Sequence, residues 1–452
     1  MKIRHVSISP TEAATENGCY ALTPELLAAT GARYSRNNEG LDAIVSKIDF
    51  NNTDKSVDGI FKMVDYGHAS IADMAPVTMF MDGISIYAAF VLWYLSPTAG
   101  GQESSTRYIN YNDSGCYLPK NADDTSKYLF SMYEKSTNIW TEILNTYPEI
   151  LNLPEGTPDK QKERFIRNFV FDRARVWLPI SAKTNVMMVK SARTWVELIS
   201  LLLSHPFEEL KEIGRGLREQ LDLVTPRLTK HAVAKNSNKY WMESWVNSYN
   251  KPIENQILTE QVYVYDNLLF DQELVNNDLG NRENRYCPPG DSIRMTSMKY
   301  IIPRISFGEL RDVNRHRTGN KFTSMRPLGF YGCKDYFTSL PLTVRCDKLL
   351  LQILDMSDEG AKFIENQTLN LNQRAPVALE EIEKTLYSLP LGTQFYFEHT
   401  TTLDKFIYQC ELRTGTGAHY KYFEHHKNLL DALYKKHPNL QGLIMEGSGE
   451  PE

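Results

Sequence analysis

The chain carries one pattern twice, as ESSTRYINYNDSGCYLP at residues 103–119 and as FTSMRPLGFYGCKDYFTSLP at residues 322–341. Both stretches contain Ser-x-Arg, pass through an aromatic-rich turn and close on Leu-Pro, and their arginines are Arg107 and Arg326. A pattern that recurs within one chain is a sign of duplicated architecture. The two stretches therefore predict two related halves.

The segments around these stretches follow one order in both halves. Apolar residues at helical spacing predict a long helix after each stretch, at about residues 124–146 and 346–370. An apolar segment of strand or helix character precedes each stretch, and a helix ending in Leu-Pro and a last helix follow. These segments are 74–95, 174–184 and 191–224 in the first half, and 297–313, 385–395 and 401–435 in the second.

The repeat divides the chain into two expected domains, residues 1–240 and 261–445. We expect a linker at residues 241–260, because this region is rich in Asn, Ser and Trp and shows no sustained period. The tail, residues 446–452, is expected to be disordered. A chain of 452 residues exceeds one ordinary core, which agrees with two domains.

Composition narrows the classes of function. The net charge of -6 gives no overall basic field, so we expect no nucleic acid polymer as a partner. The apolar run 87–94 is too short to span a membrane, and the first ten residues lack the apolar segment of a secretory signal. Six scattered cysteines without a CxxC pair fit reduced thiols in the cytoplasm and predict no metal site.

The segment NRHRTGNKFTSMRP, residues 314–327, places Arg315, His316 and Arg317 side by side. Adjacent cationic side chains repel each other, and an anion among them would hold them together. An exposed basic turn is the alternative reading of this triplet.

Five segments resemble motifs of the flavin-dependent thymidylate synthases, the ThyX family, and the resemblance covers most of the chain. The family has an Arg-His-Arg signature followed by a serine, a Gly-His-x-Ser segment, a Glu-x-Ser-x-Arg loop, an Ala-Arg-x-x-Leu-Pro helix end and a Leu-Arg helix. The similar segments here are NRHRTGNKFTSMR (314–326), YGHASIAD (66–73), TAGGQESSTRY (98–108), RARVWLP (173–179) and CELRTGTGAHY (410–420). The resemblance implies an α+β fold with two tandem domains, each a small, mostly antiparallel sheet flanked by long helices.

Each copy departs from the family pattern, and the departures are complementary. The first copy has Leu95, Ser96 and Pro97 in place of the Arg-His-Arg triplet, and Leu202 where the second has Arg413. The second copy has no Gly-His-x-Ser segment, has Phe322 and Thr323 in place of an Asn-Glu pair, and has Leu386 where the first has Arg175. In the family the nucleotide lies between two protomers. The retained residues thus predict one composite site built from both copies, whereas neutral decay of a dead duplicate is the alternative.

The resemblance assigns expected roles to individual residues. Arg413 is expected to be catalytic, stabilising charge on the pyrimidine as C5 becomes nucleophilic. The expected nucleotide-binding residues are Glu103, Ser104, Ser105, Arg107, Arg175, Asp312, Arg315 and Arg413. The expected cofactor-binding residues are His68, Ser70, Arg193, Arg315, His316 and Arg317.

Several of these residues have plainer readings. His68 could be a structural residue at a helix start, Arg193 a solvated helix arginine, and Asp312 a partner of Arg311 or Arg315. The adjacent His425 and His426 point about 100° apart on a helix, so we expect them on the surface and not as metal ligands.

Three classes of function remain open. The first is a flavin-dependent transferase that adds a one-carbon unit to C5 of a pyrimidine nucleotide, with FAD as cofactor and NADPH and a methylene-folate as possible co-substrates. The second is an inactive flavin- or nucleotide-binding protein, and the third is a structural partner of a true synthase. The resemblance also implies a homodimer, a pseudo-tetramer of ThyX-like domains. The sequence does not distinguish uracil from cytosine or ribose from deoxyribose.

Overall fold

The computed structural model describes two compact units, which do not coincide with the two halves of the sequence. It covers the chain except residues 39, 66–68, 97–99, 152, 154–155, 260–261, 270, 334–339, 341, 346, 374, 416–418 and 448–452. Contacts place residues 1–104 and 183–244 in the first unit, and residues 105–182 and 245–452 in the second. The predicted tail thus lies largely outside the described residues.

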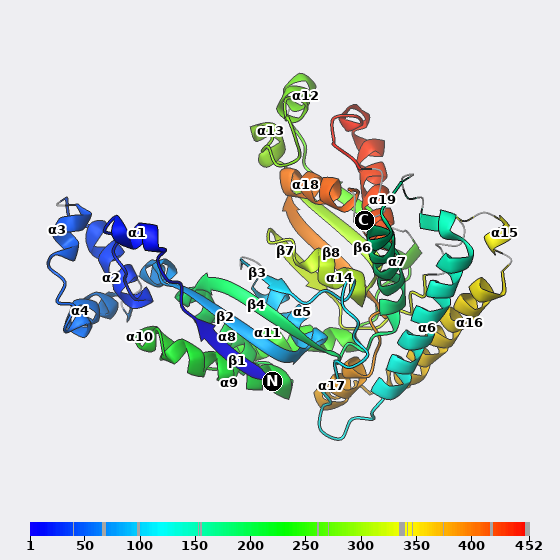
Figure 1. The fold of residues 1–452 in the computed structure, drawn as a ribbon, viewed down its shortest axis with the longest axis horizontal. Coiled ribbons are helices and arrows are strands. Elements are labelled where there is room, and N and C mark those ends of the chain that lie inside the picture. The colour runs from blue at the N-terminus through cyan, green and yellow to red at the C-terminus, as the bar shows by residue number, and fades with distance from the viewer. Residues whose placement is uncertain are drawn as a thin grey trace. The chain divides into compact units, whose positions relative to one another are not determined.

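The first unit contains a four-stranded antiparallel sheet in the order β1-β2-β4-β3. Its strands are β1 (Lys2–Val6), β2 (Pro76–Ser85), β3 (Gly100–Glu103) and β4 (Lys183–Ser191). The accompanying helices are α5 (Ile86–Leu95), α8 (Ala192–Leu203), α9 (Glu208–Asp222) and α10 (Pro226–Thr229). A separate group of N-terminal helices, labelled in Figure 1, comprises α1 (Glu12–Glu16), α2 (Pro24–Tyr34), α3 (Leu41–Val45) and α4 (Thr53–Asp65).

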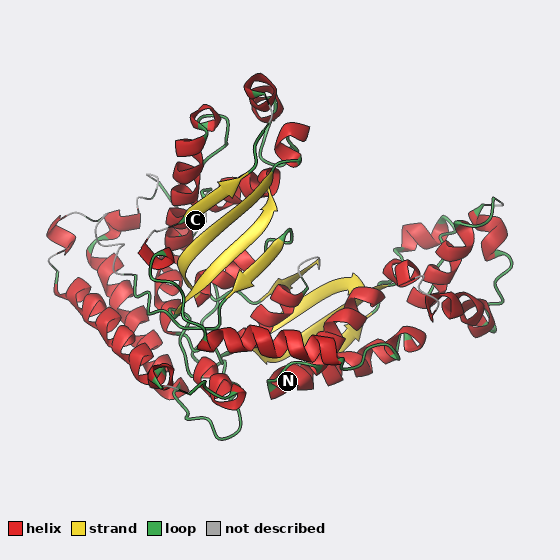
Figure 2. Ribbon diagram, turned by 180° about the vertical axis from the view of Figure 1, so that it is seen from behind, coloured by secondary structure: helices red, strands yellow, loops and turns green. Residues whose placement is uncertain are grey.

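The second unit contains a matching sheet in the order β5-β6-β8-β7, and Figure 2 shows both sheets in yellow. Its strands are β5 (Tyr263–Asp266), β6 (Ser297–Ser306), β7 (Asn320–Thr323) and β8 (Gln394–Thr402). The helices that position the site are α14 (Phe307–Asn314), α18 (Leu403–Arg413) and α19 (Tyr420–Lys436), with α12 (Gln272–Gly280) and α13 (Asp291–Arg294) before them. The outer helices are α6 (Ser126–Thr146), α7 (Asp159–Ala174), α15 (Leu342–Arg345), α16 (Lys348–Gln367) and α17 (Leu379–Tyr387).

The two sheets confirm the predicted α+β class and the tandem organisation. In each copy a ten-residue strand leads directly into a helix whose N-cap is a serine. The Ser85 hydroxyl accepts a hydrogen bond from Ala88 N at 2.9 Å, and the Ser306 hydroxyl accepts one from Glu309 N at 3.3 Å. The apolar segments 74–95 and 297–313 therefore hold a strand and a helix in succession.

The predicted last helix of each half is wrong, because each is two helices. Helices α8 and α9 replace the expected 191–224, and α18 and α19 replace the expected 401–435. Pro206 lies in the first break, where its ring and missing N–H oppose continuation of a helix. The surface placement of His425 and His426 is also wrong, since their exposed fractions are 6% and 0%.

Helices α6 and α16 lie side by side in the second unit, although they come from different copies (Figures 1 and 2). The ring of Tyr128 stacks on that of Phe363 at 5.2 Å, and the Tyr128 hydroxyl donates to Glu359 at 2.7 Å. The two Leu-Pro segments also pair, with Pro179 opposite Pro390. The repeat and the compact units therefore divide the chain differently.

The segment expected as a linker contains ordered structure. Helix α11 (Asn236–Val246) enters it, and the side chains of Trp245 and Tyr249 are buried within the second unit. No helix among the described residues is both long and apolar enough to cross a membrane.

Candidate functional site

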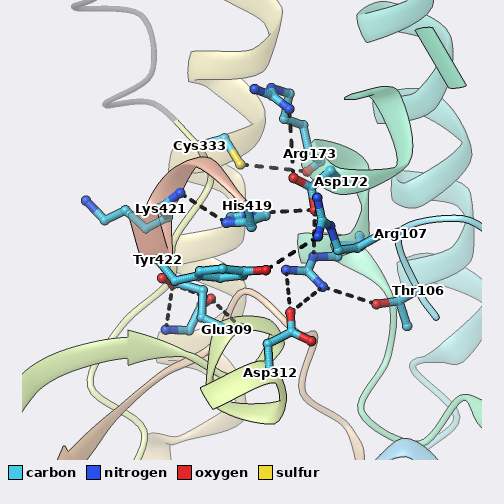
Figure 3. A network of polar contacts seen from close by, with 12 residues as sticks. Thr106, Arg107, Asp172, Arg173, Glu309, Asp312, Cys333, His419, Lys421 and Tyr422 are labelled. Carbon is cyan, nitrogen blue, oxygen red and sulfur yellow. Dashed lines mark hydrogen bonds and ion pairs between the residues drawn. The ribbon is translucent and has the colours of Figure 1, made fainter. Parts of the chain in front are cut away.

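Asp312 belongs to an arginine cluster in the second unit, part of which is drawn in Figure 3. Its Oδ2 accepts hydrogen bonds from both terminal nitrogens of Arg175 at 3.2 Å, and its Oδ1 pairs with Arg315. Its backbone carbonyl accepts a hydrogen bond from Arg413 at 3.1 Å. One residue thus contacts three of the predicted site arginines, including one from the first copy.

Asp172 is the second carboxylate of the cluster. Its Oδ1 accepts a hydrogen bond from Arg107 Nε at 2.8 Å and lies 3.5 Å from Arg175 Nε. Its Oδ2 lies 3.9 Å from Arg173, and its Oδ1 lies 3.8 Å from His419 Nε2. Asp172 therefore links Arg107 to Arg175, just as Asp312 links Arg175 to Arg315.

Tyr422 contacts Arg107 and Arg413, the two arginines that are farthest apart in the sequence, and Figure 3 shows its contact with Arg107. Its hydroxyl is 3.4 Å from Arg107 Nη1, and its ring centre is 5.2 Å from the guanidinium carbon of Arg413. The ring of His419 stacks on that of Tyr422 with a centroid distance of 5.4 Å. Arg107 and Arg413 thus share one aromatic neighbour.

Local helix geometry explains these pairings. Asp172 and Arg175 are three residues apart at the end of α7, and Asp312 and Arg315 are three residues apart at the end of α14. Residues at this spacing lie on one helix face. A capping box between Ser306 and Glu309 fixes the start of α14.

The site carries more positive than negative charge. Arg107, Arg173, Arg175, Arg315 and Arg413 lie around the two aspartates. Burial alone would raise the pKa of both carboxyl groups, but the arginines outweigh it. They hold the pKa of Asp312 well below its usual range and lower that of Asp172 to about 2. Burial lowers the pKa of His419 to about 4, so this imidazole is neutral at pH 7.

The turn after α14 holds the Arg-His-Arg triplet. His316 Nε2 accepts a hydrogen bond from Arg413 Nε at 2.9 Å, and burial together with Arg413 keeps the pKa of His316 well below its usual value. Lys321 donates to the carbonyls of Asn314, at 3.0 Å, and of His316. Arg317 is exposed. The triplet therefore presents one exposed arginine, one partly exposed arginine and a histidine that binds Arg413.

The Ser-x-Arg motif has the same local geometry in both copies. Ser105 Oγ accepts a hydrogen bond from the backbone N–H of Arg107 at 3.2 Å, and Ser324 Oγ accepts one from Arg326 at 3.2 Å. The Arg326 side chain donates to the carbonyl of Tyr249 at 3.3 Å. Arg107 contacts the cluster, whereas Arg326 has a backbone partner outside it.

The remaining predicted residues belong to the first unit. Glu103 ends β3, and Ser104 donates its N–H to the carbonyl of Asn185 at 3.0 Å. Ser70 is exposed in the 3-10 helix η1 (Ala69–Met74). Arg193 pairs with Asp73 and Glu197, each at 3.1 Å, and lines a cavity of about 240 Å³. His68 lies outside the described residues.

The N-cap serines Ser85 and Ser306 occupy equivalent positions in the two copies. Aligning them changes which residues of the first copy correspond to the Arg-His-Arg triplet. Counted from these caps, the triplet 315–317 corresponds to Tyr94, Leu95 and Ser96, one residue earlier than the sequence comparison placed it. None of these three residues carries a charge.

Sequence reasoning missed four members of the site: Thr106, Asp172, His419 and Tyr422. The buried Thr106 hydroxyl accepts hydrogen bonds from Arg175 at 3.3 Å and from Arg311 at 3.1 Å. Asp172 had a visible signal, because a carboxylate three residues before Arg175 shares its helix face. Nothing local marks Tyr422 as a neighbour of Arg107, since their contact joins residues 315 positions apart.

Comparisons with known proteins find similarity to one protein family. The model for "Thymidylate synthase complementing protein" matches residues 20–227. A UPF0159 protein of Thermoplasma acidophilum is 21% identical, over 91% of this chain and 93% of its own. A UPF0159 protein of Chlamydia pneumoniae is 24% identical, over 46% of this chain and 45% of its own.

One solved structure is a UMP/dUMP methylase, PolB, from Streptomyces cacaoi bound with 5-Br dUMP. It is 13% identical and covers 51% of this chain and 93% of its own, with a TM-score of 0.33. The family match falls on the first copy, and the relative from Thermoplasma spans both. Residues 20–227 are therefore similar to the thymidylate synthase complementing protein family, and the relative from Thermoplasma is similar to the chain along both copies.

Proposed function

We propose that this protein is a flavin-dependent transferase that acts on C5 of a pyrimidine nucleotide, such as dUMP, at one composite site. One observation supports this above all. Arg107 and Arg175 from the first copy gather with Arg315 and Arg413 from the second around Asp312, Asp172 and Tyr422. These are arginines that the two copies retain despite their complementary departures from the family pattern.

The chemistry of the cluster suits a nucleotide monophosphate. The phosphate is an anion, and arginine binds such oxygens with two parallel N–H donors. The excess of positive charge described above remains for such a ligand after the two aspartates are counted. Arg413, which packs against the ring of Tyr422, would then stabilise charge that develops on the pyrimidine.

The Arg-His-Arg turn is our proposed flavin side of the site. Arg315 is 34% exposed and Arg317 is exposed, so both cations can meet the pyrophosphate of FAD from solvent. Ser70, Arg193 and His68 of the first unit stay predicted FAD-binding residues, and we propose NADPH and a methylene-folate as co-substrates. Bound flavin would supply the hydride chemistry, while the chain binds and orients the nucleotide.

The test is dUMP binding by isothermal titration calorimetry. A charged hydrogen bond contributes roughly 1.5–3 kcal/mol, so Arg107→Ala and Arg413→Ala should each weaken binding about ten-fold or more. The double variant should be non-additive, because both side chains contact one ligand. Arg326→Ala is the matched control, since Arg326 donates to a backbone carbonyl outside the cluster. Loss of binding on Arg326→Ala, with Arg107→Ala unaffected, would refute the composite site.

Turnover separates this proposal from its alternatives. Purified protein that carries flavin, and methylates dUMP when folate and a reductant are supplied, would be the transferase. Binding of flavin and nucleotide without turnover would indicate the inactive binding protein. Absence of both would leave the structural partner of a synthase. We further propose a cytoplasmic homodimer, whose mass light scattering would measure.

A further inference from the structure

A path of hydrogen bonds crosses the core of the second unit. His399 Nε2 donates to the carbonyl of Thr318 at 2.7 Å, and His399 Nδ1 accepts from the Tyr300 hydroxyl at 3.1 Å. The amide of Gln409 donates to Tyr300 at 2.6 Å and to His426 Nε2 at 2.9 Å. His426 Nδ1 donates to the carbonyl of Tyr422 at 2.5 Å. We call His399, Tyr300, Gln409 and His426 the core relay.

One arrangement of protons satisfies all the hydrogen bonds of the core relay. In this arrangement both histidines are neutral, and each uses one ring nitrogen as a donor and the other as an acceptor. Burial lowers the pKa of His399 and that of His426 to about 3, which agrees with neutral rings. At most 1% of each of the four side chains is exposed.

The first copy has apolar residues at the positions equivalent to three of the four members. Tyr300 and His399 are opposite each other on β6 and β8, three residues in from the Ser297–Thr402 pair. The residues at that register on β2 and β4 are Met79 and Met188, and the seventh residue of α8 is Leu198 where α18 has Gln409. These three residues are as buried as the core relay.

The apolar residues of the first copy help to distinguish a role of the core relay in stability from a role in function. Replacing a buried polar network with apolar residues of similar volume is often neutral or stabilising, and the first copy shows that this fold accepts them. The core relay occurs in the copy that keeps the Arg-His-Arg triplet and Arg413. It is therefore poorly explained as a requirement of the fold.

The ends of the core relay lie on the segments that carry the site. Thr318 follows the triplet directly, Gln409 is one helical turn before Arg413 on α18, and the other end is the backbone of Tyr422. Arg413 itself donates to His316 in the triplet. The path thus joins the turn, α18 and α19 through directed bonds.

We infer that His399, Tyr300, Gln409 and His426 are positioning residues that hold the triplet turn, Arg413 and Tyr422 in register for the nucleotide. Apolar side chains fill the same volume but impose no fixed direction on these three segments. The inference rests on the proposed function for its ligand, but the order of the turn can be measured without any ligand.

The experiment transplants the apolar residues of the first copy into the full-length chain as Tyr300→Met/His399→Met/Gln409→Leu. We expect the midpoint of thermal unfolding to be unchanged or higher, whereas dUMP affinity falls roughly three- to thirty-fold. Hydrogen exchange followed by mass spectrometry should become faster in residues 313–323. A merely structural role would instead lower the unfolding midpoint.

The matched control exchanges apolar residues at the equivalent positions of the first copy, as Met79→Leu/Met188→Leu/Leu198→Met. It should leave dUMP affinity and exchange at residues 313–323 unchanged. Gln409→Leu alone, which cuts the path at its centre, serves as a second variant if the triple variant does not fold, and should change both readouts in the same direction.

Unchanged affinity and unchanged exchange in the folded variants would overturn the positioning role. Wild-type protein that does not bind dUMP would instead refute the proposed function alone, and the exchange measurement would still decide the role of the core relay.

Discussion

Asp312 is the residue on which the two copies depend most directly at the site. Its carboxylate pairs with Arg175 from the first copy and Arg315 from the second. Removing one partner of a buried ion pair leaves uncompensated charge, which costs about 3–5 kcal/mol. Asp312→Asn should therefore lower the free energy of unfolding by that amount, as measured by urea denaturation. Added phosphate should restore part of the loss, because an anion can replace the missing charge.

An exposed ion pair provides the control. Asp73 pairs with Arg193, and their side chains are 46% and 43% exposed. Such pairs contribute about 0–1 kcal/mol, so Asp73→Asn should change stability little and should gain nothing from phosphate. If Asp312→Asn were as stable as the wild type without phosphate, Asp312 would not be balancing the arginines.

Single residues could be predicted where a motif marks them. The motifs pointed to Arg107, Arg175, Arg315 and Arg413, and the structure brings these four into one cluster, although their role in nucleotide binding stays a prediction. The partners that orient them were not predictable in the same way. Tyr422 contacts Arg107 because segments distant in the sequence pack together, and a local sequence pattern cannot predict such a contact.

The buried histidines of the core relay, which lie on β8 and α19, should make the stability of the second unit depend on pH. Burial depresses the pKa of His399 to about 3 in the folded protein, against 6.5 for the ordinary side chain. The unfolded chain therefore binds the proton more readily between these values. Stability from this group is fully present above pH 6.5 and is lost progressively as the pH falls toward 3.

His399→Met should remove this dependence. Each such histidine contributes a slope of about 1.4 kcal/mol per pH unit below its unfolded pKa. Urea unfolding of wild type and variant at pH 7, 6, 5 and 4 should show a shallower decline for the variant, by about that slope. Met188→Leu, at the equivalent position of β4, should decline in parallel with the wild type. Parallel lines for His399→Met would mean that the folded protein protonates His399 normally.

Whole elements were predictable where one period runs without interruption. The expected helix at 124–146 is α6 (Ser126–Thr146), and that at 346–370 is α16 (Lys348–Gln367). The last helices were drawn too long, because apolar residues keep a helical spacing on both sides of a short break. In the first copy Pro206 marks the break in the sequence, but the regular spacing of apolar residues across it predicted a single helix.

At the scale of the whole molecule, the boundaries of the two predicted copies differ from the boundaries of the two compact units. The predicted boundary between the copies lies at residues 241–260, whereas contacts assign residues 105–182, predicted to belong to the first copy, to the second unit. The repeat could be found from the sequence because each copy preserves its own motifs. The assignment of α6 and α7 to the second unit could not, because it depends on packing between helices from different copies.

Dividing the chain at the repeat should therefore damage the second unit. A fragment of residues 241–452 lacks α6 and α7, and so loses the stacking of Tyr128 on Phe363 and the pairing of Pro179 with Pro390. The apolar residues that α16 buries, including Leu350, Ile353 and Met356, would lose part of their cover. We expect this fragment alone to aggregate and to show no cooperative thermal transition by calorimetry, whereas co-expression with residues 1–240 should recover a soluble complex that melts cooperatively. A fragment 241–452 that is monomeric and melts in one sharp transition would show instead that the second copy is a self-sufficient domain, and that the helices of the first copy only rest against it.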